Sequence, residues 1–185
     1  MGGCEEEYSA FERLVGEHHK LLGRDLFILE IGSAFGRSTI LLAQFGKVIA
    51  IDLWGDIHEG VEYPDMIGSN FDAFRETLQR FDLINKRVFP VLSTSKPLDL
   101  LPHMSFDVVY VDADHHYEPA KLDIQRSKNH LTQGGLFVVH DYKRPGDNPE
   151  LGVNRAVDEL LAEGDFVIKE HRRGLVCLQR KSVAA

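Results

Sequence analysis

Several runs of apolar residues in this chain do not alternate with polar residues, and most of these runs end near an acidic side chain. The clearest runs are Leu26–Ile31, Lys47–Asp52, Phe106–Asp112 and Gly134–His140. An unbroken apolar run of this length is typical of a strand with both faces buried, as in a parallel sheet covered by helices on each side. The pattern therefore predicts an α/β protein in which strands alternate with helices.

Amphipathic spacing between these runs predicts the helices, the first of them over residues 1–23. Arg87–Leu92 is a further short strand, and its Pro90 favours an edge position in the sheet. Phe166–Lys169 and Leu175–Leu178 are joined by a tight link, which forces these two strands to be antiparallel. We therefore expect a doubly wound, mostly parallel seven-stranded sheet with helices on both faces and an antiparallel last strand pair.

Residues 54–68 interrupt this rhythm. The segment contains Gly55, Gly60, Pro64 and Gly68, four acidic residues and the only tryptophan of the chain. Loops of this length in a compact domain are functional lids or disordered segments. Because the segment also carries apolar side chains, we expect a lid that closes over a ligand. A mobile, solvated insertion stays open as the alternative.

The turn after the first predicted strand contains Gly32 and Gly36. It follows a buried strand and therefore lies at the carboxyl edge of the sheet, where open α/β sheets bind their ligands. Glycines let the backbone approach a ligand closely, and a helix N-terminus offers unpaired N–H groups. Asp52 closes the next strand about 20 residues later, a position suited to binding both hydroxyls of a ribose. Burying a bare carboxylate there costs desolvation that a ligand would offset.

The spacing of the two glycines helps to discriminate between classes of nucleoside-binding site. Ser33, Ala34 and Phe35 fill the interval in which a dinucleotide fold has its middle glycine, so a pyrophosphate is disfavoured. A phosphate-binding P-loop is one residue longer and has lysine where this chain has Arg37. A degenerate P-loop-like phosphohydrolase and a non-catalytic nucleoside-binding module stay open as alternatives to an enzyme that uses a nucleoside cofactor.

Composition narrows the class of partner. The chain has 185 residues, 43% of them hydrophobic, which predicts one domain over residues 1–185. Its net charge of −8 argues against a nucleic-acid partner, because such proteins bind phosphates through clustered Lys and Arg. The sequence contains no run of about 18 apolar residues, the length that a membrane-spanning helix needs. Its acidic start is unlike a signal peptide. We expect a cytoplasmic protein with a small-molecule partner, and a homo-oligomer through the first helix stays open.

Several motifs of this chain resemble those of a known protein family. The pattern Glu-x-Gly-x-x-x-Gly at residues 30–36, followed by a strand ending in Asp52, resembles the cofactor site of class I S-adenosylmethionine-dependent methyltransferases. Residues 112–117, 134–142 and 152–157 are similar to the small-molecule O-methyltransferases that include macrolide and aminocoumarin sugar enzymes and cephalosporin hydroxylase-like proteins. The resemblance implies a Rossmann-like methyltransferase fold and methyl transfer from S-adenosylmethionine to a hydroxylated small-molecule acceptor.

The resemblance also implies residues for the cofactor. Glu30 and Ser38 would lie near its amino acid end, Asp52 would hold the ribose, and the loop from Ser93 to Ser95 would contact the adenine. The implied cofactor-binding residues are Glu30, Gly32, Ser33, Gly36, Ser38, Asp52, Trp54, Ser93, Ser95 and Asp112.

A divalent cation is the second implied ligand, held by Asp112, His140 and Asp141. Relatives carry two adjacent acids where this chain has His140 and Asp141, so the ion stays open among Mn²⁺, Fe²⁺, Co²⁺ and Mg²⁺, and imidazole suits the first three better. Such an ion lowers the pKa of a bound hydroxyl group. Asp114 and His115 are the candidate catalytic bases. The alternative is methyl transfer without a metal, with His140 as a structural histidine.

Overall fold

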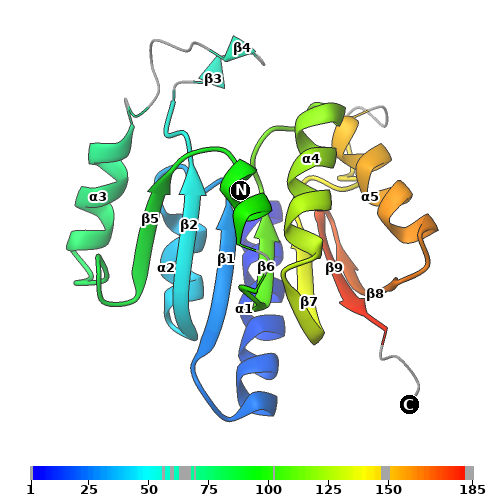
Figure 1. Cartoon of the computed structure of the whole chain (residues 1–185), viewed down its shortest axis with the longest axis horizontal. Coiled ribbons are helices and arrows are strands. Elements are labelled where there is room, and N and C mark those ends of the chain that lie inside the picture. The colour runs from blue at the N-terminus through cyan, green and yellow to red at the C-terminus, as the bar shows by residue number, and fades with distance from the viewer. Residues whose placement is uncertain are drawn as a thin grey trace.

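The computed structural model describes residues 2–55, 57–58, 61–62, 68, 70–101, 103–146 and 151–181. Its elements follow one another along the chain as strand and helix, after one helix at the start (Figure 1). In order they are α1 (Gly2–Leu22), β1 (Leu26–Ile31), α2 (Arg37–Ala43), β2 (Gly46–Asp52), β3 (Ile57–His58), β4 (Val61–Glu62), α3 (Phe71–Gln79), β5 (Val88–Leu92), the 3-10 helix η2 (Lys96–Leu100), β6 (Phe106–Val111), α4 (Tyr117–Lys128), β7 (Leu131–Val139), α5 (Gly152–Ala162), β8 (Phe166–Arg172) and β9 (Leu175–Arg180).

Seven strands form one sheet in the order β5-β2-β1-β6-β7-β9-β8. The pairs from β5 to β7 are parallel, whereas β9 runs antiparallel to both β7 and β8. The predicted fold is confirmed: a seven-stranded, mostly parallel sheet whose last strand pair is antiparallel. Figure 1 shows α3 outside β5 at one end of this sheet and the β8–β9 hairpin at the other.

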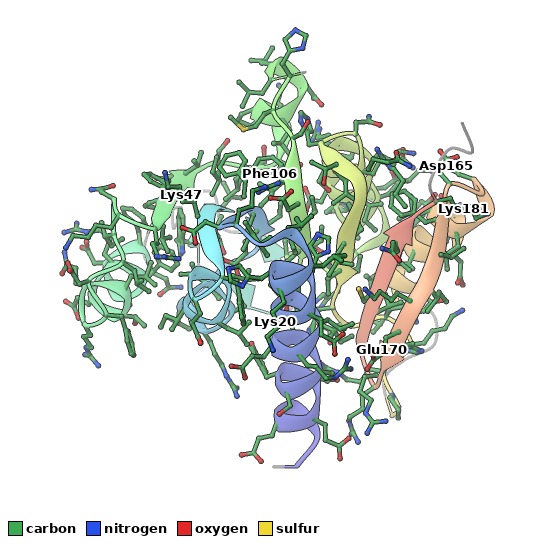
Figure 2. The ribbon with its side chains drawn as sticks, turned by 90° about the horizontal axis from the view of Figure 1, so that it is seen from below. Lys20, Lys47, Phe106, Asp165, Glu170 and Lys181 are labelled. Atoms are coloured by element: carbon green, nitrogen blue, oxygen red, sulfur yellow. The ribbon has the colours of Figure 1, made fainter. Side chains whose placement is uncertain are left out.

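Helices cover both faces of the sheet, as the unbroken apolar strands predict. On one face α1, α2 and α3 bury side chains that include Phe11, Leu42 and Phe74. On the other face α4 and α5 do so with Ile124 and Val157 among others. The view onto the edge at which β2 and β6 start, near the labelled Lys47 and Phe106, shows these two layers on opposite sides of the sheet (Figure 2). No helix within the described part of the chain is long and apolar enough to cross a membrane.

The boundaries differ from the expected ones mainly in the second half of the chain. Pro90 lies in β5, which is an edge strand as expected. The last two strands are longer than expected: β8 continues past Lys169 to Arg172, and β9 continues past Leu178 to Arg180. Only Arg173 and Gly174 form the turn between them, with Arg173 at φ 54°. Cross-strand pairing, which the local apolar pattern does not report, extends this hairpin into polar residues.

The expected lid over residues 54–68 lies mostly outside the described residues. Its described parts are residues 54–55, the short antiparallel pair β3 and β4, and Gly68. Trp54 does not belong to a solvated loop: it is 1% exposed and packs its ring 4.8 Å from Phe71 and 4.7 Å from Phe74. The expectation that this side chain would lie in water without a ligand is wrong, because α3 supplies an aromatic surface that buries it.

Candidate active site

The turn between β1 and α2, here called the glycine turn (residues 32–36), depends on two left-handed glycines, Gly32 at φ 88° and Gly36 at φ 87°. A Cβ atom at position 32 would lie 2.1 Å from the carbonyl oxygen of Asp112. The first requirement for glycine here is therefore close packing of the turn against the end of β6. This contact also places the glycine turn directly beside the acidic residues that follow β6.

Glu30 is fully buried at the end of β1, below the glycine turn. Its Oε2 atom accepts hydrogen bonds from the hydroxyl groups of Ser33 and Thr39. Burial raises the pKa of the Glu30 carboxyl to about 7, and the neighbouring hydroxyl groups offset this only in part. Its Oε1 atom makes no hydrogen bond within the described part of the chain. Ser38, buried in the first turn of α2, lies in the same region.

Asp52 supports the glycine turn from the end of β2. Its Oδ2 atom accepts hydrogen bonds from the backbone N–H groups of Ser33 at 2.7 Å and Ala34 at 2.8 Å. Its Oδ1 atom accepts a third from Trp54 N–H at 2.6 Å. The expectation of a bare carboxylate is wrong, because backbone donors already offset its desolvation. Ribose binding by Asp52 stays a prediction, and would use the remaining acceptor capacity of the carboxylate.

The two serines predicted to contact adenine lie in different surroundings. Ser93 follows β5, and its backbone N–H donates to the carbonyl of Asp52 at 3.0 Å. Ser95 is 1% exposed, and its hydroxyl accepts a hydrogen bond from Arg126 of α4 at 3.2 Å. Ser93 therefore lies beside the predicted ribose site, whereas Ser95 links the start of η2 to α4.

Four side chains from the ends of β6 and β7 form what we call the strand-end cluster: Asp112, His115, His140 and Asp141. The Nδ1 atom of His140 lies 3.2 Å from Asp112 Oδ1 and also 3.2 Å from Asp141 Oδ2. The Nε2 atom of His115 lies 2.7 Å from the same Asp141 oxygen. Asp141 has φ 58°, a left-handed conformation that is strained for a residue other than glycine.

Opposite charges hold this cluster together. Burial by itself lowers the pKa of His140, but hydrogen bonds and charges of Asp112 and Asp141 outweigh burial and raise the pKa to about 10. The hydrogen bond to Asp141 raises the pKa of His115 as well. Burial would raise the pKa of Asp141, yet the two imidazoles hold it far below its usual range. Asp141 is therefore ionised at neutral pH beside two imidazoles that favour their protonated forms.

Three further residues of this region were not found from the sequence. Tyr110 donates a hydrogen bond from its hydroxyl to Asp112 Oδ2 at 2.8 Å. Arg144 lies 2.8 Å from Asp141 Oδ1 and 3.1 Å from Glu7 Oε2. Glu7 comes from α1, more than a hundred residues away in sequence, and only the tertiary structure reveals it. A basic residue three positions after Asp141 was the one local signal for Arg144.

The two candidate bases are separated by the structure. His115 joins the strand-end cluster through Asp141, with its side chain 48% exposed. Asp114 turns instead to His116, whose Nδ1 lies 2.7 Å from Asp114 Oδ1 and whose backbone N–H donates to the same oxygen at 2.7 Å. An incoming acceptor would therefore meet His115 beside the cluster and Asp114 in a separate pair.

The residues present fit both implied ligands. One ligand atom each from Asp112, His115 and Asp141 lie within 4.8 Å of one another, and two carboxylates with an imidazole are a common donor set for divalent transition metals. In this set His115 takes the place that the sequence assigned to His140. For S-adenosylmethionine, the buried Glu30 Oε1 atom lacks a hydrogen-bond donor, which a cofactor ammonium group would supply.

The sheet order and strand-end residues together define a Rossmann-like methyltransferase fold. The chain belongs to a family described as a methyltransferase domain, whose model matches residues 29–142. An uncharacterized protein of Acanthamoeba polyphaga mimivirus is 28% identical over 149 residues. That match covers 75% of this chain, which spans only 62% of the length of the viral relative.

Solved structures agree on the fold. The O-methyltransferase NovP has a TM-score of 0.73 at 20% identity, with 96% of this chain and 80% of that chain covered. The O-methyltransferase from Bacillus cereus, in complex with S-adenosylhomocysteine, has a TM-score of 0.66 at 19% identity, with 94% and 80% covered. The family match supports a methyltransferase, and none of these findings favours the phosphohydrolase or the non-catalytic module.

Proposed function

We propose that this methyltransferase transfers the methyl group of S-adenosylmethionine to a hydroxyl group of a small molecule, with a divalent cation at the strand-end cluster. One observation carries the proposal: the glycine turn packs directly against the backbone of Asp112, the first residue of that cluster. A methyl donor at the turn and an acceptor at the cluster would then be neighbours, as in-line transfer requires.

In the proposed reaction the acceptor oxygen gains a methyl group and loses its proton. The carbon–sulfur bond of the sulfonium breaks, a carbon–oxygen bond to the acceptor forms, and the hydroxyl proton leaves for a base on the protein. A divalent cation, when bound by Asp112 and Asp141, supplies polarisation of the acceptor oxygen. With the two carboxylates as the ligands, His115 does not bind the cation, and it is the base we favour because it lies beside Asp141 and is half exposed.

The pKa of His115 explains why a cation would help. Its hydrogen bond to Asp141 raises the pKa and favours the protonated ring, which cannot accept a proton. If Asp141 bound a cation, its negative charge would stabilise the protonated ring of His115 less, and the pKa of His115 would be raised less. Asp114, held by His116, is the alternative base.

Ligand binding tests the first half of the proposal. S-adenosylhomocysteine should raise the melting temperature of the protein, because a ligand that binds only the native state stabilises it by mass action. ATP and NAD should leave the melting temperature unchanged. A melting temperature that rises only with ATP or NAD would contradict the proposal and favour the phosphohydrolase or the nucleoside-binding module.

Metal removal tests the second half. Chelation should abolish methyl transfer to a hydroxylated acceptor without loss of S-adenosylhomocysteine binding, and Mn²⁺, Fe²⁺ or Co²⁺ should restore activity better than Mg²⁺. Full activity after exhaustive chelation, with no ion detected by elemental analysis, would leave Asp141 and His140 as structural residues.

A further inference from the structure

Glu7 is a buried carboxylate that the proposed chemistry does not use. It lies in the second turn of α1, outside the part of the chain that the family model matches, and only 3% of it is exposed. A carboxylate is rarely buried to this degree unless it is paired, because desolvation of the charge is costly. Its partners therefore indicate why it is there.

Those partners come from two segments beside the strand-end cluster. Glu7 Oε1 accepts a hydrogen bond from the backbone N–H of Gly174 at 2.9 Å, in the turn between β8 and β9. Glu7 Oε2 lies 3.1 Å from Nη2 of Arg144 and 3.4 Å from Nε2 of His140. One oxygen thus anchors the hairpin, and the other faces the cluster.

The contact with His140 determines where the other ring nitrogen points. With Nε2 toward Glu7, Nδ1 faces Asp112 and Asp141 at 3.2 Å from each. A carboxylate beside one imidazole nitrogen helps to fix the orientation of the ring, and with it the contacts that the other nitrogen makes. Glu7 Oε2 faces His140 Nε2 at an ion-pair distance of 3.4 Å, and Arg144 Nη2 lies 3.1 Å from the same nitrogen, so both side chains constrain the ring.

Arg144 strengthens the same arrangement. Its guanidinium bridges Glu7 at 3.1 Å and Asp141 at 2.8 Å, so it connects α1 to the cluster a second time. The space around it is tight: a Cβ atom at position 174 would lie 2.7 Å from Arg144 Nε. Gly174 therefore leaves room for the guanidinium that Glu7 holds.

We propose that Glu7 is a positioning residue, whose Oε2 atom orients His140 and Arg144 so that they hold Asp112 and Asp141 in the reactive arrangement. The proposal rests on the proposed function for the meaning of the cluster. The orientation itself is a property of the protein without ligands, so it can be tested even if the methyl acceptor is never found.

Glu7→Gln separates the two roles of this side chain. The amide oxygen can still accept the hydrogen bond from Gly174 N–H, whereas the amide nitrogen cannot accept one from Arg144 and carries no negative charge to face His140. Glu6→Gln is the matched control, because Glu6 is exposed on the same turn and the charge change is the same. Thermal unfolding establishes that each variant is folded.

The deciding measurement is the nitrogen-15 NMR spectrum of the imidazole rings at one fixed pH, without metal or cofactor. Glu7→Gln should displace the ring signals of His140, assigned with His140→Gln, while Glu6→Gln leaves them in place. The His130 signals should stay fixed in both variants, because that ring lies between the carbonyls of Met104 and Leu98. His140 signals that coincide in Glu7→Gln and the wild type would overturn the proposal.

Manganese binding provides a second test of the positioning role of Glu7. Mn²⁺ affinity, measured by electron paramagnetic resonance of the free ion, should fall about 10- to 100-fold in Glu7→Gln and stay unchanged in Glu6→Gln. Equal Mn²⁺ affinity of Glu7→Gln and the wild type would also overturn the proposal. A wild type that does not bind Mn²⁺ would contradict the metal in the proposed function and leave the ring signals to decide.

A second variant covers the case in which Glu7→Gln does not fold. Glu7→Asp keeps the charge but is one methylene shorter, so its carboxylate cannot reach both Gly174 and His140 in the same way. It should displace the His140 signals as well, and signals at their wild-type positions in a folded Glu7→Asp would likewise overturn the proposal.

Discussion

In the glycine turn, Asp52 accepts three hydrogen bonds from backbone N–H groups that lie within 19 residues of it. In the strand-end cluster, Asp141 is surrounded by side chains instead: His115, His140 and Arg144. The turn is therefore held by uncharged backbone donors, whereas the cluster is held by ionisable side chains. The difference predicts that changes in the cluster affect the chemistry most and changes in the turn affect cofactor affinity.

Asp141→Asn should have the largest effect. The asparagine keeps the shape of the side chain but removes the charge that pairs with His115 and His140, and methyl transfer should fall by at least about 10²-fold. S-adenosylhomocysteine affinity, measured by calorimetry, should stay within a few-fold of the wild type. Asp72→Asn, an exposed position on α3, is the control. A large loss of cofactor affinity in Asp141→Asn would show that the two regions do not work separately.

Glu30→Gln should change how stability depends on pH. The folded-state pKa of Glu30, about 7, is raised above that of the unfolded chain. Its contribution is fully present below about pH 4.5 and is lost as pH rises to about 7, because the unfolded chain loses its proton first. The wild type should therefore lose up to roughly 3 kcal/mol over this range that Glu30→Gln keeps, since one pKa unit corresponds to about 1.4 kcal/mol.

Urea unfolding at several pH values measures this effect without any ligand. Parallel stability curves for the two proteins from pH 4.5 to pH 7 would contradict the assignment of a raised pKa to Glu30.

Asp52→Ala should weaken S-adenosylhomocysteine binding by roughly 1.5 to 3 kcal/mol, the range for hydrogen bonds to a charged group. The variant leaves the N–H groups of Ser33, Ala34 and Trp54 without their acceptor, so the glycine turn should loosen as well. Calorimetry gives the affinity, and hydrogen exchange of these N–H groups reports the turn. Equal affinity of Asp52→Ala and the wild type would remove Asp52 from the cofactor site.

Arg13→Ala should have the smallest effect and sets the baseline for α1. Arg13 pairs with Glu170 of β8 at 2.7 Å, but its side chain is 47% exposed. Exposed ion pairs contribute less than about 1 kcal/mol to stability. Thermal unfolding should show a small shift, and the ring signals of His140 should not move. A displacement of these signals would mean that general loosening of α1, and not Glu7 itself, controls the cluster.

Much of the fold could be predicted from the sequence because it depends on local patterns. Unbroken apolar runs identify buried strands, and Pro90 indicated an edge strand that the structure has at that place. The length of the last hairpin could not be predicted, because its polar ends are strands only through pairing of β8 with β9. Trp54 was assigned to a lid for a similar reason: its burial depends on α3, which follows later in the chain.

The sequence by itself determined the strand ends at which chemistry is placed, since Glu30, Asp52, Asp112 and Asp141 all follow or close apolar runs. Only the tertiary structure decided which of these groups meet. It brought His115 to Asp141 and turned Asp114 away to His116, because side-chain directions in a loop depend on the neighbours that they contact. It also brought Glu7 from α1 to His140, a contact across more than a hundred residues that no local pattern encodes.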